Sequence, residues 1–195
     1  MQVKFSVLFA CDVHSAQYAL FLQRYILCLH YSEHRRIFKK QYSFLNGYLQ
    51  NVVAPFMGMP SGMYHLHHVV MHHKENNIMP WDLSSTEPYQ RDSLLHWLHY
   101  LFRFMIGAWV ELPYYAVKRG KPGLAAFAVG CAAFYFGSVS MLRAFVSATA
   151  TFWVFMVPMP ITSMALMFGN WSQHIYVDPK VAERRSSDSC NYGLT

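Results

Sequence analysis

Histidine is concentrated in one short stretch of the sequence, YHLHHVVMHHKENN, which runs from Tyr64 to Asn77. Five of the nine residues from His65 to His73 are histidine, in a chain that is 54% hydrophobic. Burying several imidazoles in apolar surroundings without partners costs free energy. Neutral imidazole is a ligand that suits zinc, copper, iron and nickel. This stretch therefore predicts a metal site.

The spacing of the histidines fits ligation from helices, because side chains at i and i+4 lie on one face. His68 and His72 have this spacing, and His30 and His34 repeat it in the motif HYSEH. A further histidine ends the motif NWSQH, and each group lies beside the end of an apolar segment. The predicted metal ligands are His30, His34, His68, His72, His73 and His174, and His65 and His67 are weaker candidates.

The number of candidates bears on the kind of metal site. Eight histidines are more than one zinc ion needs, since a catalytic zinc usually keeps three protein ligands. Two metal ions are the economical interpretation, and two irons with open positions would suit oxygen activation. The four cysteines lie far apart without CxxC spacing, which argues against a thiolate site. The isolated His14, His96 and His99 are interpreted as core or interface residues.

Long apolar segments must carry these ligands, and the clearest lie near the C-terminus. Residues 122–142 and residues 144–169 are both free of charge, and Arg143 lies at the joint. At about 1.5 Å per residue, either run can cross the roughly 30 Å hydrocarbon core of a bilayer. We predict two transmembrane helices joined by a tight turn; the alternative is a buried hairpin in a soluble bundle. An N-terminal span is predicted at about residues 15–30, where charged and polar residues make the signal weaker.

The region between these spans, about residues 93–117, has apolar residues at helical spacing. Ser93 can cap its start, and His96, His99 and Arg103 form a polar stripe. This pattern predicts an amphipathic helix in the membrane interface. The hairpin then returns the chain to the same side, so all histidine groups share one face. Residues 178–195 are predicted to be a polar tail.

The composition agrees with a membrane protein. Charged residues make up 13% of the chain, against about 25% in soluble proteins. The net charge of +6 arises from basic residues in short groups at the ends of segments. This placement fits the positive-inside rule, with the histidines on the cytosolic side, better than a nucleic-acid groove. We predict a single all-α integral membrane domain over residues 1–195, with no nucleic-acid partner and no cleavable signal peptide.

The motifs HYSEH, HHVVMHH and NWSQH, in this order around an interfacial helix and a two-span hairpin, resemble the membrane fatty acid desaturase and hydroxylase superfamily. The longer strings HHVVMHHKENN and DLSSTEPYQRDS resemble a desaturase-domain branch of algae and fungi. The resemblance covers about Leu27 to Pro179. His30 and His34 match the first histidine box, and His68, His72 and His73 match the second with one extra intervening residue. Asn170 and His174 match the later asparagine–histidine pair, so the resemblance implies that Asn170 is a further metal ligand, bound directly or through water.

The resemblance implies a cofactor of two iron ions held by histidines, and a hydrophobic channel for an acyl chain. It also implies an electron donor, cytochrome b5 or ferredoxin. Other membrane protein subunits are further expected partners. The expected location is the endoplasmic reticulum or the membrane of a plastid or mitochondrion. Four nearby polar residues are predicted to orient the ligand imidazoles by bonding the ring nitrogen that does not face the metal: Glu33, Glu75, Asn76 and Asn77.

The sequence also departs from the family pattern. The family has another HxxHH box after the asparagine–histidine pair, whereas His174 is the last histidine before Thr195. Up to three ligands are therefore missing, and the N-terminus has room for one span where two are common. Two hypotheses follow. One is an oxygen-dependent di-iron fatty acyl desaturase or hydroxylase, as a fragment or as one part of a split enzyme.

The other hypothesis is a catalytically inactive desaturase-like structural subunit of a larger membrane complex. The sequence leaves open which of the two applies, and hence whether the chain is an enzyme. A histidine-rich metal transporter is disfavoured, because the two clear spans contain no carboxylate.

Overall fold

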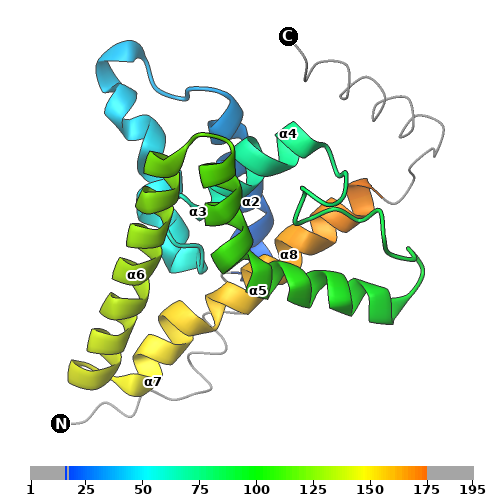
Figure 1. The fold of residues 1–195 in the computed structure, drawn as a ribbon. Helices are drawn as coiled ribbons and strands as arrows, with labels where there is room; N and C mark the ends of the chain where they lie inside the picture. Colours follow the sequence, from blue (N-terminus) through cyan, green and yellow to red (C-terminus); the bar gives the residue numbers. More distant parts are fainter. Residues whose placement is uncertain (1–15, 17, 175–195) are drawn as a thin grey trace.

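The computed structural model describes Ala16 and residues 18–174, and every regular element in this part of the chain is helical (Figure 1). The prediction of an all-α fold is confirmed. The elements are η1 (Tyr18–Leu22), α2 (Gln23–His34), η2 (Lys40–Gly47), η3 (Leu49–Val53), η4 (Ala54–Met57), α3 (Met63–His65), η5 (Leu66–His72), α4 (His73–Glu75), α5 (Leu94–Lys118), α6 (Pro122–Phe145), α7 (Ala148–Thr151), η6 (Phe152–Met156) and α8 (Pro158–Gln173). The predicted tail and the first part of the predicted N-terminal span lie outside the described residues.

Two of the described helices are long and apolar enough to cross a membrane. They are Pro122–Phe145, and Ala148–Gln173, in which α7, η6 and α8 follow one another. Only 22% and 17% of their apolar stretches are buried inside the molecule. A core helix of a soluble protein would be mostly buried, so the low burial favours contact with lipid. In Figure 1 the pair forms a hairpin whose turn lies at the lower left and whose two arms diverge upward.

The turn of this hairpin lies a few residues beyond the position predicted from the sequence. Arg143 is still helical, and the break falls at Val146 and Ser147. The carbonyl of Leu142 accepts bonds from the backbone N–H groups of both of these residues, which closes α6. The Ser147 hydroxyl then accepts from the N–H of Ala150 at 3.2 Å and caps the next helix. The cap, and not the charge of Arg143, therefore sets the turn.

Helix α5 packs against α6, α8 and η5 and forms the centre of the fold. Its buried residues recur about every four positions, from Tyr100 through Phe104 and Ala108 to Leu112. They belong to one core cluster with Leu66, Val70 and Met71 of η5 and Met167 and Trp171 of α8. The histidine-bearing helix η5 is thus fixed on its apolar side by α5.

The polar residues predicted to form a stripe on this helix include two that bind the preceding loop, residues 76–93. The ring nitrogen Nδ1 of His96 accepts from the backbone N–H of Gln90 at 2.7 Å. Arg103 donates to the carbonyl of Leu83 at 2.8 Å, and its other nitrogen lies 3.1 Å from Glu111. Gly107 stands between the two charged residues on the helix, and a Cβ there would meet the Glu111 carboxylate at 2.6 Å. These contacts hold the loop beside the histidines.

Candidate metal centre

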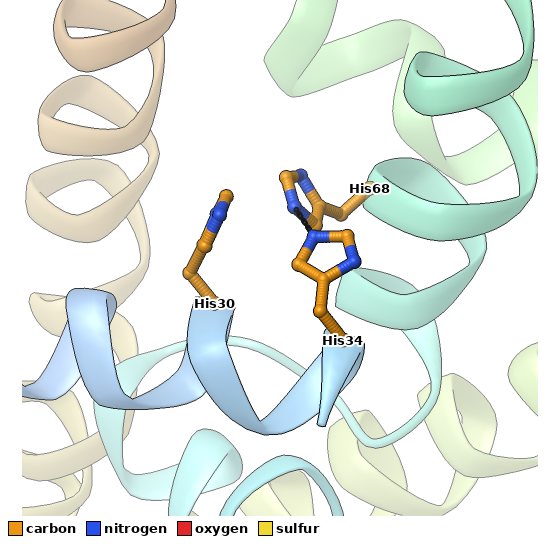
Figure 2. Close-up of side chains that lie close together, drawn as sticks. All are labelled: His30, His34 and His68. Atoms are coloured by element: carbon orange, nitrogen blue, oxygen red, sulfur yellow. Dashed lines mark hydrogen bonds between the residues drawn. The ribbon is translucent and has the colours of Figure 1, made fainter.

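Helix α2 brings the first histidine pair to the site. It is anchored by Leu29, which is fully buried and packs with Ala54, Met59 and Tyr64. Its neighbour His30 and, one turn later, His34 then face η5. Figure 2 shows these two rings and that of His68, from η5, pointing toward one another.

The ring nitrogens of this group converge closely. Nε2 of His68 lies 3.1 Å from Nε2 of His34 and 3.0 Å from Nε2 of His73. One ligand nitrogen from each of His30, His34 and His68 can be chosen so that all lie within 4.8 Å of one another. Two nitrogens bound at about 2.1 Å to one ion, at right angles, are about 3 Å apart. The spacing therefore fits a shared metal ion.

A second set of rings lies beside the first. The ring centroids of His72 and His174 are 5.5 Å apart, and His72 is 5.7 Å from His73 and 6.1 Å from His68. His174 directly follows the end of α8, so it reaches the cluster from the last apolar helix. The structure thus brings together all six histidines that the sequence singled out most strongly. They arrive from three separate helical regions, as a metal centre requires.

Asn170 lies one helical turn before His174 and is held from two sides. Its amide nitrogen donates to the carbonyl of Ser84 at 2.9 Å and to the hydroxyl of Tyr100 at 2.7 Å. These bonds occupy both amide hydrogens and leave Oδ1 as the atom that could bind a metal. The side chain also lines the same cavity as His30, His68 and His72.

Asp82 is the main partner behind the cluster. This carboxylate is fully buried and accepts from Nδ1–H of His72 at 2.8 Å, from the N–H of Asn77, and from both the N–H and the hydroxyl of Ser84. Burial alone would raise the pKa of Asp82, but the bond and charge of His72 outweigh it and hold that pKa at about 2. A carboxylate on Nδ1 fixes the tautomer and turns Nε2 of His72 toward the site.

The two weaker candidates, His65 and His67, have other partners. Nδ1 of His65 lies 2.7 Å from the carboxylate of Glu33, whose side chain is 3% exposed. Nε2 of His67 lies 2.9 Å from the hydroxyl of Ser84. Because that hydroxyl donates its hydrogen to Asp82, its oxygen accepts from His67. Nε2 of His67 therefore carries a hydrogen and is not available to bind a metal.

The fatty acid desaturase family model matches residues 8–195, which is nearly the whole chain. The chain belongs to the fatty acid desaturase family. The resemblance seen in the histidine motifs is thereby confirmed. Neither the curated proteins nor the solved structures gave a match.

The desaturase family is membrane-associated and generally holds two irons. The candidate ligands of this desaturase-family chain fit iron both in the spacing of their nitrogens and in the protonation state of their rings. Burial, and then the neighbouring imidazoles, lower the pKa of His68 to about 2. Burial also depresses the pKa values of His73 and His174. These rings are neutral at pH 7, and neutral imidazole is the form that binds metal.

Two cavities adjoin the histidines of this desaturase-family chain. One is lined by His30, His68, His72 and Asn170. The other is almost wholly apolar and extends between α5, α8 and the segment around Met59 and Met63. Tyr64, His67 and Leu166 line both cavities and so form the wall between them. An apolar space therefore lies directly beside the candidate metal ligands.

Sequence reasoning found some of the supporting residues and missed others. Glu33 contacts a histidine as expected of it, but Glu75 instead accepts from Tyr115 and Arg119. Asp82 and Ser84 were missed, although they hold His72 and His67. The signal that could have found them is local: an aspartate two residues before a serine favours a side-chain-capped turn, here ten residues after His72.

Proposed function

We propose that the chain takes part in oxygen-dependent oxidation of fatty acyl chains, as a desaturase or hydroxylase with two irons. The observation that supports this most directly is the convergence of ring nitrogens from His34, His68 and His73 at about 3 Å, beside His30. Membership of the desaturase family supports the reaction class.

The donors divide into two sets. His30, His34, His68 and His73 would hold one iron, and His72, His174 and Asn170 would hold the other. Bound iron would supply the oxidising power needed by an unactivated methylene, which offers no polar handle for acid–base chemistry.

The protein's own groups would position and shield the reaction. Asp82 would keep the proton on Nδ1 of His72, and thereby keep Nε2 available as a ligand. Tyr64 stacks on the ring of His68 with centroids 5.1 Å apart and would restrict its rotation. The apolar cavity behind Tyr64 would hold hydrocarbon and exclude water from it.

We further propose that the histidines lie on the cytosolic side. In Figure 1, α2 and α8 end, and α6 begins, toward the upper part of the fold, away from the lower turn of the hairpin. Lys118, Arg119 and Lys121 lie where α5 ends and α6 is about to begin, and such basic residues favour the cytosolic side. An electron donor such as cytochrome b5 or ferredoxin would approach from there. The α2 region would enter the bilayer from the opposite side, and α5 would lie along the interface.

The test is the iron content of the full chain, purified from its membrane. Two irons per chain are expected, and His68→Ala should lose iron from the first set. His99→Ala is the matched control, because His99 is an exposed histidine outside the cluster that contacts only the ring of Tyr89 among the described aromatic residues. One iron per chain would contradict the two-iron proposal. A folded chain without iron would contradict oxidation altogether and favour the inactive structural subunit.

A further inference from the structure

The segment between α2 and η3, residues 35–48, presents several apolar side chains that the described fold leaves about half or more exposed. The exposed fraction is 46% for Ile37, 49% for Tyr42, 76% for Phe44 and 50% for Tyr48. We call residues 35–48 the anchor segment. Scattered apolar residues on a surface are ordinary, but this many in so short a segment mark a surface that contacts something.

The charges of the anchor segment are all of one sign. Arg35, Arg36, Lys39 and Lys40 are exposed, and the sequence has no aspartate or glutamate between Glu33 and Glu75. None of these four cations takes part in an ion pair with the described residues. The surface is therefore complementary to a partner that carries negative charge next to apolar material.

The anchor segment is nevertheless well ordered by its own hydrogen bonds. The side-chain oxygen of Asn46 accepts from the backbone N–H groups of Ile37 and Phe38, both at 2.9 Å, and its amide donates to the carbonyl of Ser43 at 3.1 Å. These bonds fold the loop back over η2. Backbone groups satisfied in this way can approach the apolar zone of a membrane at lower cost.

The chain continues from the anchor segment onto the apolar hairpin. The ring centroids of Phe56, in η4, and Phe155, in η6, are 5.7 Å apart. At Gly58 the two backbones are so close that a Cβ would lie 2.3 Å from the nitrogen of Met159. The cyan region of Figure 1 shows this course, from the far end of the segment down beside α6. The anchor segment thus adjoins the surface that faces lipid.

We propose that the anchor segment binds the anionic headgroup surface of the bilayer on the histidine side. Its four cations contact lipid phosphates, and Tyr42, Phe44 and Tyr48 lie at the boundary of headgroups and acyl chains. Continuity with the apolar hairpin favours lipid over an acidic protein as the partner. The inference does not depend on iron or on catalysis.

The experiment uses the full chain in nanodiscs of phosphatidylcholine, with and without phosphatidylglycerol, and follows amide hydrogen exchange of residues 37–48. Protection should be greater with phosphatidylglycerol. Each cation near an anionic membrane surface contributes about fivefold. Lys39→Gln/Lys40→Gln should therefore lower the protection factor by about 25-fold with phosphatidylglycerol and little without it.

Lys74→Gln/Lys121→Gln is the matched control, since it removes two exposed cations outside the anchor segment and should leave the protection unchanged. Phe44→Ser should lower protection in both lipid mixtures. Unchanged exchange in α5 and α6 shows that each variant is folded. Equal protection with both lipids, for the wild type and the lysine variant, would overturn the proposal. Protection that arises only on adding an acidic protein would overturn it in favour of a protein partner.

Discussion

Asp82→Asn is the substitution that tests most directly how the candidate metal centre is supported. Each oxygen of Asp82 accepts two bonds: one oxygen from His72 and Asn77, and the other from the backbone and hydroxyl of Ser84. Asparagine keeps the shape of the side chain but replaces one oxygen with an NH₂ group. In either orientation of the amide, its NH₂ group faces two groups that donated hydrogen bonds to Asp82, so two hydrogen bonds are lost.

The cost follows from these contacts. A hydrogen bond to a charged group contributes about 1.5–3 kcal/mol, so losing two costs about 3–6 kcal/mol. That is a large share of the roughly 5–15 kcal/mol by which a domain is stable. The loss of the carboxylate behind His72 should also weaken metal binding about 10- to 100-fold.

The assay is chelator competition for iron at pH 7.5, together with denaturant unfolding in detergent. Asp92→Asn is the control, because Asp92 is exposed and its only described side-chain partner is Gln90. If Asp82→Asn does not fold, Ser84→Ala keeps the carboxylate and should weaken iron binding less than tenfold. Wild-type iron affinity in a folded Asp82→Asn chain would refute the assigned role of Asp82.

Three further predictions follow from the same contacts. Glu33→Gln should cost about 1 kcal/mol of unfolding free energy, because His65 then bonds a neutral amide in place of a buried carboxylate. The pKa of His67 is about 3 in the fold against 6.5 in the unfolded chain, so only the unfolded chain takes up a proton as the pH falls below 6.5. The free energy of unfolding should therefore fall on acidification, by about 1.4 kcal/mol at pH 5.5. His67→Gln should remove this pH dependence, as measured by denaturant unfolding at several pH values. Gly58→Ala should cost more than 3 kcal/mol in the same assay, because the methyl group would clash with the backbone of Met159 in a left-handed conformation (φ +78°).

The predictions for Glu33 and Gly58 each have a matched control. Glu87→Gln alters an exposed carboxylate that accepts only from the N–H of Met79 among its described partners. Gly120→Ala changes a glycine with similar φ, +70°, but with no atom within 4 Å of the added carbon, so it should cost only the backbone strain. Equal costs at Gly58 and Gly120 would contradict the close packing of η4 on α8. An unchanged pH slope in His67→Gln would contradict a neutral, buried His67.

Much of the architecture could be predicted because it depends on properties local in sequence. The charge-free runs after Pro122 predicted the apolar hairpin, and α6 begins at that residue. The i, i+4 spacing of His30 and His34 predicted that they share a face of α2. Hydrophobic length and helical periodicity are properties of single segments, so they indicate a helix without knowledge of how the rest of the chain packs.

The supporting contacts could not be predicted in the same way, because they join segments far apart in the chain. Glu75 binds Tyr115 and Arg119, which lie 40 and 44 positions away. Asn170 is held by Tyr100 and by the carbonyl of Ser84, 70 and 86 positions away. A sequence pattern shows that such a residue is polar, but the packing of α5 against α8 decides which partner it meets.

The way α2 is held links ligand binding to the fold itself. Leu29 is the only residue of α2 that is buried, so apolar packing fixes this helix weakly. Its other contacts with the α3–η5 region are polar: Glu33 with His65, and His30 and His34 with the imidazoles opposite. Elements held by few apolar contacts open most readily. A metal shared between α2 and η5 would therefore dock α2 as well as bind to it, so the loss of His34 should loosen the helix and not merely remove one ligand.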